Sequence, residues 1–206
     1  MNLGIDIDGV MTNFEAFGTE YAARWQYFHK MPIIYKPFYK LYYAFGFSRH
    51  PDTASMSTDE KNIFEQFYKE ILYEYTQNCP VRSTWPEVLQ SLKENGHKIF
   101  IVTKRYTAYS WLSNTEEKKQ AVKDFLQKSN ITYDAISFPD ENSNKLEECV
   151  KHNLDILLDD DPSVLDEISS YKRITPICFH AGYNEYYRFK NRVRSPYEFK
   201  AFIDNL

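Results

Sequence analysis

The chain of 206 residues lacks any apolar run of the roughly 18 residues that a membrane span requires. Cysteine is scarce: Cys79, Cys149 and Cys178 lie far apart and form no CxxC pair, so we expect reduced thiols and no disulfide framework or zinc site. No charge sign dominates, with 25 Lys and Arg against 29 Asp and Glu, so no nucleic-acid polymer is expected as a partner. The opening residues MNLGIDIDG place two carboxylates where a signal peptide has its apolar core, so we expect a cytoplasmic protein without one.

The sequence also lacks internal repeats, a Gly/Ser-rich linker and a low-complexity tail. A hydrophobic fraction of 43% is sufficient for a packed core. This length suits one domain, or one domain that carries a sizeable insertion.

Apolar strands alternate with helical patterns along most of the chain. Strands are expected at residues 3–5, 98–103, 135–138, 155–159 and 174–179. Helices are expected at residues 84–96, 113–129, 145–152, 162–170 and 196–206. The first two begin at the capping patterns Thr84-x-x-Glu87 and Ser113-x-x-Glu116. This alternation predicts an α/β protein with a parallel sheet, helices on both faces, and ligands beyond the carboxyl ends of the strands.

Residues 14–80 break the alternation. Helical patterns are expected over residues 14–29, and again after the capping pattern Ser57-x-x-Glu60. The second pattern has apolar residues at helical spacing: Ile63, Phe64, Phe67, Ile71 and Leu72. We therefore expect a helical cap at 14–80, inserted after the first strand of a core that comprises residues 1–13 and 81–206.

Carboxylates crowd the ends of two expected strands. Asp6 and Asp8 follow the first strand, and a run of three Asp, residues 159–161, follows the strand at 155–159. Taken singly, these are ordinary turn residues, and one of the three could cap a helix at Pro162. If both strand ends share one edge of the sheet, the carboxylates repel one another, and a hard divalent cation would neutralise that repulsion. An all-oxygen donor set favours Mg²⁺.

Thr103 and Lys145 are unremarkable by composition. Thr103 ends an apolar strand, where its hydroxyl can be satisfied by the backbone, and Lys145 could be a surface lysine. Their order relative to the acidic residues is what makes them candidates for the site.

Four motifs in this order resemble those of the haloacid dehalogenase superfamily. They read Asp6-Ile-Asp8-Gly9-Val10, Ile99-Phe-Ile-Val-Thr103, Lys145, and Ile156-Leu-Leu-Asp159-Asp160. The resemblance implies a Rossmann-like parallel sheet with a cap inserted after the first strand. Within the superfamily the chain resembles the 5'(3')-deoxyribonucleotidase group and its bacterial nucleotidase relatives. That likeness rests on the size of the insertion, on Phe14-Glu15 after the first motif, and on the ending Asp159-Asp160-x-Pro162.

The resemblance implies roles for the acidic residues. Asp6 would be the nucleophile that forms an aspartyl-phosphate. Asp8 would protonate the leaving alkoxide and then activate water. Mg²⁺ would be bound by Asp6, by the backbone carbonyl of Asp8 and by Asp160, with Asp159 as the second choice for the last ligand.

The resemblance also implies phosphate-binding roles. Thr103 would hydrogen-bond a phosphate oxygen, and Lys145 would neutralise charge on the phosphate and on Asp6. Lys104 and Arg105 depart from the small residue that the group often has at this point. They either contact the phosphate or are solvated; we include Lys104 with the phosphate-binding residues and expect Arg105 to be solvated.

Residues 21–51 contain no Asp or Glu, five Lys or Arg and eleven aromatic residues. Five of these aromatics fit one helical face: Tyr35, Phe38, Tyr39, Tyr42 and Phe45. They could pack the cap against the core or against a second subunit in a homodimer, or they could offer stacking rings and positive charge to an anionic substrate. A membrane-surface helix is the weakest alternative, because no long charged face is present. Phe14 is expected to bind substrate by stacking on a base.

The leading hypothesis is a Mg²⁺-dependent phosphomonoester hydrolase, acting as a 5'-nucleotidase on (deoxy)nucleoside monophosphates. The alternatives are a phosphatase for another small metabolite such as a sugar phosphate, a phosphomutase, and a catalytically idle module that binds ligands through the aromatic cap. The expected partner is a small phosphorylated molecule, with no membrane and no nucleic-acid polymer.

Overall fold

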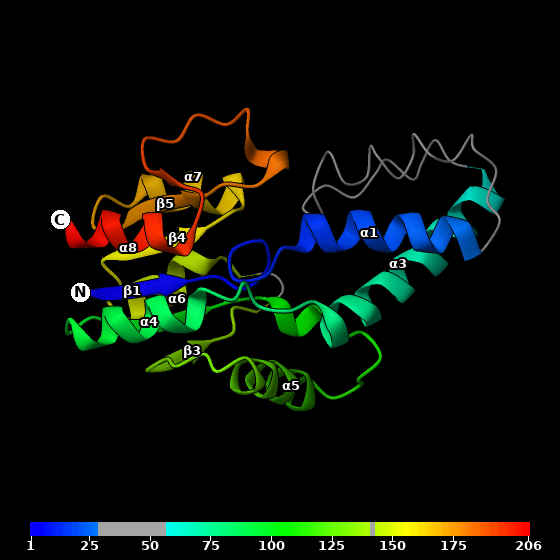
Figure 1. Cartoon of the computed structure of the whole chain (residues 1–206), viewed down its shortest axis with the longest axis horizontal. Coiled ribbons are helices and arrows are strands. Elements are labelled where there is room, and N and C mark those ends of the chain that lie inside the picture. The colour runs from blue at the N-terminus through cyan, green and yellow to red at the C-terminus, as the bar shows by residue number, and fades with distance from the viewer. Residues whose placement is uncertain (29–56, 141–142) are drawn as a thin grey trace.

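The computed structural model describes residues 1–28, 57–140 and 143–206. Its centre is a six-stranded parallel sheet in the order β3-β2-β1-β4-β5-β6 (Figure 1). The strands are β1 (Asn2–Ile5), β2 (Lys98–Val102), β3 (Ala135–Ser137), β4 (Ile156–Asp159), β5 (Thr175–Phe179) and β6 (Arg192–Val193). The predicted α/β fold with a parallel sheet is thus confirmed. All four residues of β4 are buried, as expected for a central strand covered on both faces.

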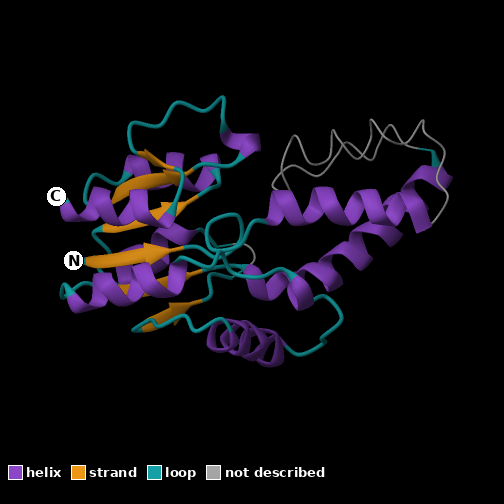
Figure 2. Ribbon diagram, in the orientation of Figure 1, coloured by secondary structure: helices purple, strands orange, loops and turns teal. Residues whose placement is uncertain are grey.

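Helices cover both faces of this sheet. They are α4 (Trp85–Glu94), α5 (Thr115–Lys128), α6 (Lys145–Lys151), α7 (Pro162–Ser170) and α8 (Pro196–Asp204). Trp85 of α4 and Phe199 of α8 belong to the larger buried cluster, whereas Cys149 of α6 and Ile168 of α7 belong to a second cluster on the opposite face. Figure 2 shows the strand arrows running in one direction, so their carboxyl ends share one edge of the sheet.

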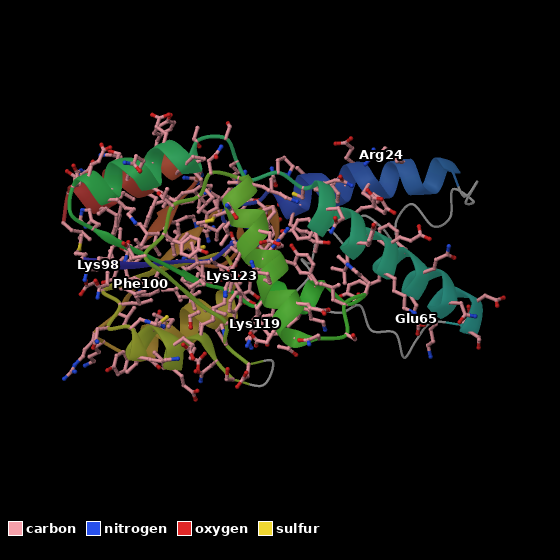
Figure 3. The ribbon with its side chains drawn as sticks, turned by 90° about the horizontal axis from the view of Figure 1, so that it is seen from below. Arg24, Glu65, Lys98, Phe100, Lys119 and Lys123 are labelled. Carbon is pink, nitrogen blue, oxygen red and sulfur yellow. The ribbon has the colours of Figure 1, made fainter. Side chains whose placement is uncertain are left out.

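Among the described residues between β1 and α4, the chain forms two long helices, α1 (Phe14–Phe28) and α3 (Thr58–Asn78). They pack on each other, with the rings of Tyr21 and Phe67 at 6.0 Å. Figure 3 shows both helices projecting from the core, α1 marked by Arg24 and α3 by Glu65. The two helices expected in this segment are confirmed, and the division into a core and a cap at 14–80 stays a prediction. Most of the aromatic stretch 21–51, with the dimer contact expected there, lies outside the described residues.

Several element ends differ from the expectation. Helix α5 is capped by Asn114 and not by Ser113: the Asn114 side chain accepts a hydrogen bond of 2.8 Å from Glu116 N. Thr84 precedes α4 with helical backbone angles and makes no side-chain cap, so Thr84-x-x-Glu87 does not act as a capping box. Strand β6 was not predicted, because two residues are too short for a periodic pattern.

The three cysteines are buried and unpaired, as expected. Of the helices that the structure describes, none combines the length and the apolar character that crossing a bilayer demands.

Candidate active site

The site lies at the carboxyl edge of the sheet, around the loops that follow β1, β2 and β4. A cavity of about 710 Å³ opens there. Its lining includes seven of the eight residues predicted for the site: Asp6, Asp8, Thr103, Lys104, Lys145, Asp159 and Asp160. The eighth, Phe14, is not among the described residues that line it. The predicted convergence of the two acidic segments is observed, since β1 and β4 are adjacent strands.

Lys145 is the buried cation of the site. It is the first residue of α6, and its Nζ lies 2.8 Å from Asp6 Oδ1 and 2.7 Å from Asp159 Oδ2. Burial alone would lower the pKa of Lys145, but the charges of Asp159 and Asp6 outweigh it and raise that pKa above its usual value. Lys145 is therefore a permanent ammonium that bridges two strand ends, and it is not a surface lysine.

Asp6 and Asp160 carry more negative charge than this one cation balances. Burial, with the charges of Asp159 and Asp8, raises the pKa of Asp6 to about 7 despite the ion pair with Lys145. Burial and the charges of Asp159 and Asp6 also raise the pKa of Asp160 well above its usual value. A carboxylate pair that is costly to ionise together is the environment that a bound cation relieves.

The donor set fits a hard divalent cation. One carboxylate oxygen from each of Asp6, Asp159 and Asp160 lies within 4.8 Å of the others, and all three residues are buried. Both oxygens of Asp159 are already in use, one with Lys145 and the other accepting from Asp161 N at 2.9 Å. Asp6 and Asp160 are therefore better placed as ligands than Asp159. All-oxygen donors of this kind suit Mg²⁺.

Gly9 allows the two acidic segments to approach each other. Its φ is +81°, and a Cβ at this position would lie 1.7 Å from Asp160 Oδ2. A side chain there would be strained and would push Asp160 out of the cluster. Asp161 has a structural role: it caps α7 by accepting from Ser163 N at 2.8 Å, as the alternative reading of the Asp run allowed.

Thr103 and Lys104 follow β2 at the mouth of the cavity. Thr103 is fully buried, and its Oγ1 accepts a hydrogen bond of 3.1 Å from Arg105 N, so its hydroxyl proton can be donated to a ligand. Lys104 Nζ donates to the carbonyl of Ser143 at 2.6 Å. Lys104 also lines the cavity, so it adds a second lysine to the cavity wall.

Asp8 is held apart from the acidic cluster. Its Oδ1 accepts from the hydroxyl of Tyr75 at 2.5 Å and from Nη1 of Arg105. The expectation that Arg105 is solvated is wrong, because its side chain is 0% exposed and lies between the rings of Tyr75 and Phe125. Burial would lower the pKa of Arg105, but the Asp8 charge outweighs it and raises that pKa.

Phe14 lies at the start of α1 and is half-buried. Its ring meets the ring of Tyr75 edge-on, with centroids 4.3 Å apart. Phe14 therefore contacts Tyr75, and Tyr75 in turn binds Asp8. A role in base stacking stays a prediction.

Tyr183 was missed by the sequence reasoning. It belongs to a short 3₁₀ helix after β5 (Gly182–Asn184), lines the cavity and donates its hydroxyl to Asp160 Oδ2. Burial and the Asp160 charge raise the pKa of Tyr183, so the hydroxyl remains a donor. The only available signal was its position after an apolar strand of the predicted sheet.

Solved structures with a similar fold span nearly the whole chain. A haloacid dehalogenase-like hydrolase from Streptococcus pneumoniae matches with a TM-score of 0.61 and 13% identity, over 98% of this chain and 97% of that one. The HAD-hydrolase YfnB from Bacillus subtilis, described as bound to magnesium, matches with a TM-score of 0.59 and 15% identity, over 98% of each chain. A predicted phosphatase from Clostridium acetobutylicum matches with a TM-score of 0.57 and 16% identity, over 100% of this chain and 98% of that one.

The chain has the fold of the haloacid dehalogenase superfamily. A β-phosphoglucomutase from Clostridium difficile is also among the matched structures. No family model and no curated protein matches the chain. None of the structures named above is described as a nucleotidase, so the finer resemblance to the deoxyribonucleotidase group stays a prediction. In this haloacid dehalogenase fold, the four predicted motifs surround one cavity.

Proposed function

We propose that the protein is a Mg²⁺-dependent phosphomonoester hydrolase that works through an aspartyl-phosphate on Asp6. The observation that supports this most strongly is the ion pair between buried Asp6 and Lys145, next to Asp160 in a cavity at the strand ends. A carboxylate held by a fixed ammonium is suited to attack phosphorus, because the ammonium attracts the phosphate and fixes the carboxylate.

In the first step, an oxygen of Asp6 attacks phosphorus and the bond from phosphorus to the ester oxygen breaks. The electron pair of that bond goes to the leaving oxygen, which takes a proton from Asp8. Thr103 donates its hydroxyl proton to a phosphate oxygen, and Lys145 balances the charge that collects on the phosphoryl group.

In the second step, water attacks phosphorus of the aspartyl-phosphate and gives its proton to Asp8. The bond from phosphorus to Asp6 breaks, which frees inorganic phosphate and restores both carboxyl groups. Asp6 and Asp160, with the Asp8 carbonyl and with Asp159 as the alternative ligand, would hold Mg²⁺. The ion would supply charge neutralisation to the phosphate and to the crowded carboxylates.

Nucleoside monophosphates are the first substrate class to test, on the strength of the motif resemblance and of Phe14 near Asp8. A second candidate is a sugar phosphate, favoured by further polar residues in the lining of the cavity. That lining includes Thr107, Asn144, Ser163 and Glu167, whose groups suit hydroxyl-rich leaving groups. A phosphomutase would share the first step, and an idle binding module would show no turnover.

The test is release of inorganic phosphate from a panel of nucleoside monophosphates, sugar phosphates and p-nitrophenyl phosphate, with Mg²⁺ and with excess chelator. We expect turnover that depends on Mg²⁺ and disappears in Asp6→Asn. Turnover that survives in Asp6→Asn would place the nucleophile elsewhere. Binding without turnover in the wild type would favour the idle module.

A further inference from the structure

Only one of the two carboxylate oxygens of Asp8 accepts hydrogen bonds from the described residues. Oδ1 accepts from Tyr75 at 2.5 Å and from Arg105, while Oδ2 has no hydrogen-bond partner among the residues that the structure describes. The Asp8 side chain is 34% exposed and lines the cavity. Since Oδ1 already accepts two protons, a proton carried by Asp8 has to sit on Oδ2.

Tyr75 reaches this position from α3, 67 residues along the chain from Asp8. Its hydroxyl oxygen lies 2.6 Å from Thr12 Oγ1. Because Tyr75 gives its proton to Asp8, the Thr12 hydroxyl is the donor in that contact, and its longer contact of 3.2 Å with the Ile7 carbonyl shares the same proton. The ring of Tyr75 is buried and packs on Phe14 and Phe17, at 4.3 Å and 5.7 Å. The hydrogen bonds to Asp8 and Thr12 and the packing of the ring therefore hold the Tyr75 hydroxyl in place beside Asp8.

Asp8 is the hydrogen-bond partner of the Arg105 guanidinium, whose other two nitrogens make no such bond with the described residues. Its guanidinium is stacked on Tyr75 and Phe125, at 4.6 Å and 4.2 Å from the ring centroids. Nε and Nη2 are buried and make no hydrogen bond within the described part of the chain. A buried charge with unmade hydrogen bonds is costly, and stacking on rings offsets only part of that cost. A residue that served packing alone would not need this charge, whereas one that orients a carboxylate does.

We propose that Tyr75 and Arg105 are positioning residues that lock the rotamer of Asp8, so that Oδ2 faces the leaving oxygen of the substrate. The inference rests on the proposed function, in which Asp8 is the general acid. Tyr75 is not among the cavity-lining residues. Arg105 does line the cavity, but its Nη1 is engaged by Asp8 and its Nε and Nη2 are buried, so we expect it to act on the substrate through Asp8. Through Tyr75, the geometry of the acid depends on a helix of the inserted segment.

Leaving-group dependence separates positioning from packing. A simple alkyl phosphate releases a strongly basic alkoxide that needs a proton, whereas p-nitrophenyl phosphate releases a stable phenolate that does not. Tyr75→Phe keeps the ring and removes only the hydroxyl that holds Asp8. The quantity to compare is kcat/KM, which reports the steps up to release of the leaving group and excludes the later hydrolysis, in which Asp8 acts on every ester alike. General acid catalysis is worth about 10²–10⁴-fold, so partial loss of alignment should lower kcat/KM for the alkyl ester by roughly tenfold or more. For the aryl ester we expect kcat/KM to change by less than about threefold.

Tyr106→Phe is the matched control. It removes another buried hydroxyl near Arg105, one that donates to the Pro139 carbonyl at 3.1 Å and does not touch Asp8. We expect it to affect both esters alike. Arg105→Lys keeps the charge without the planar fork, so it should show the same selective loss as Tyr75→Phe and should retain more alkyl-ester activity than Arg105→Met.

Equal losses on the two esters in Tyr75→Phe, or no loss on either, would overturn the inference while leaving the proposed function in place. A wild-type protein without phosphatase activity on any ester would overturn the proposed function and this inference with it. A selective loss on the alkyl ester, absent from Tyr106→Phe, would support it. Thermal melts of each variant show whether a loss on both esters comes from unfolding.

Discussion

Lys145 Nζ lies 2.8 Å from Asp6 Oδ1, so an ammonium at the start of α6 is paired with a carboxylate at the end of β1. The same ammonium is 2.7 Å from Asp159. One buried cation thus serves two carboxylates, and Asp160 lies beside them without a cation of its own among the described ion pairs. The excess negative charge makes ionisation of Asp6 costly in the folded protein and so raises its pKa.

Replacing Lys145 should therefore damage both activity and stability. In Lys145→Ala the buried carboxylates lose their counter-ion, which we expect to lower the free energy of unfolding by about 3 kcal/mol in metal-free buffer. Phosphatase activity should fall by at least about a hundredfold. Urea denaturation and phosphate release measure the two effects. The control is Lys151→Ala at the exposed end of the same helix. A wild-type rate in Lys145→Ala would mean that the third motif is misplaced.

Asp6 and Asp8 are two residues apart, yet we expect only the asparagine variant of Asp8 to lose stability. Asp6→Asn removes one charge from a crowded buried cluster, so in metal-free buffer above pH 7 its free energy of unfolding should equal or exceed that of the wild type. Asp8→Asn leaves the buried guanidinium of Arg105 without its carboxylate, which should cost about 3 kcal/mol. Chemical denaturation in the presence of chelator measures both. The same sign of change in both variants would contradict this account of the charges.

Much of the site could be predicted from the sequence, because the end of a buried strand is visible as a polar residue that follows an apolar run. Asp6, Thr103 and Asp160 each follow an apolar strand, and parallel strands bring such residues to one edge. Lys145 could be placed only through the order of the motifs. The partners of Asp8 could not be predicted. Arg105 sits in a polar turn that looks solvated, and it is buried only because α3 and α5 bring rings to both sides of it.

Magnesium should stabilise the folded protein as well as support turnover. Mg²⁺ bound by Asp6 and Asp160 would relieve the repulsion that raises the pKa values of both groups. At a Mg²⁺ concentration about a hundredfold above Kd, the stabilisation should be roughly 2.7 kcal/mol. Thermal melts with increasing Mg²⁺ measure it, with Asp160→Asn as the variant expected to lose the response. Full turnover in excess chelator would refute the metal assignment.

Asp134 should make the fold sensitive to acid. Its carboxylate accepts hydrogen bonds from Ile99 N at 2.8 Å and from Lys93 Nζ at 3.0 Å. Burial alone would raise its pKa, but these two contacts outweigh burial and lower that pKa below the usual 3.8. The folded state therefore binds this proton less readily than the unfolded state, so the stabilisation is present above about pH 4 and is lost as the pH falls below that.

The variant that checks this is Asp134→Asn. We expect it to lower the free energy of unfolding by at most ~1 kcal/mol at neutral pH, since the ion pair is largely exposed. The difference from the wild type should shrink below pH 4. Asp166→Asn, at an exposed position on α7, is the control and should show no such pattern. A difference that grows as the pH falls would contradict the assigned direction.

Phe14 decides between a nucleotide and other phosphate esters. Phe14 lies at the start of α1 and contacts Tyr75, which binds Asp8. The resemblance to the nucleotidase group implies that its ring stacks on the base when the phosphate is at Asp6. Stacking is worth about 1–3 kcal/mol per base, so Phe14→Ala should raise KM for a nucleoside monophosphate roughly tenfold to a hundredfold. Its effect on p-nitrophenyl phosphate should be much smaller.

Phe14→Leu, which keeps bulk against Tyr75 without an aromatic face, separates stacking from packing. It should reproduce the KM effect without lowering the melting temperature. Equal losses on both substrates in Phe14→Ala, with recovery of both in Phe14→Leu, would assign Phe14 to packing and would remove the main support for a nucleotide substrate.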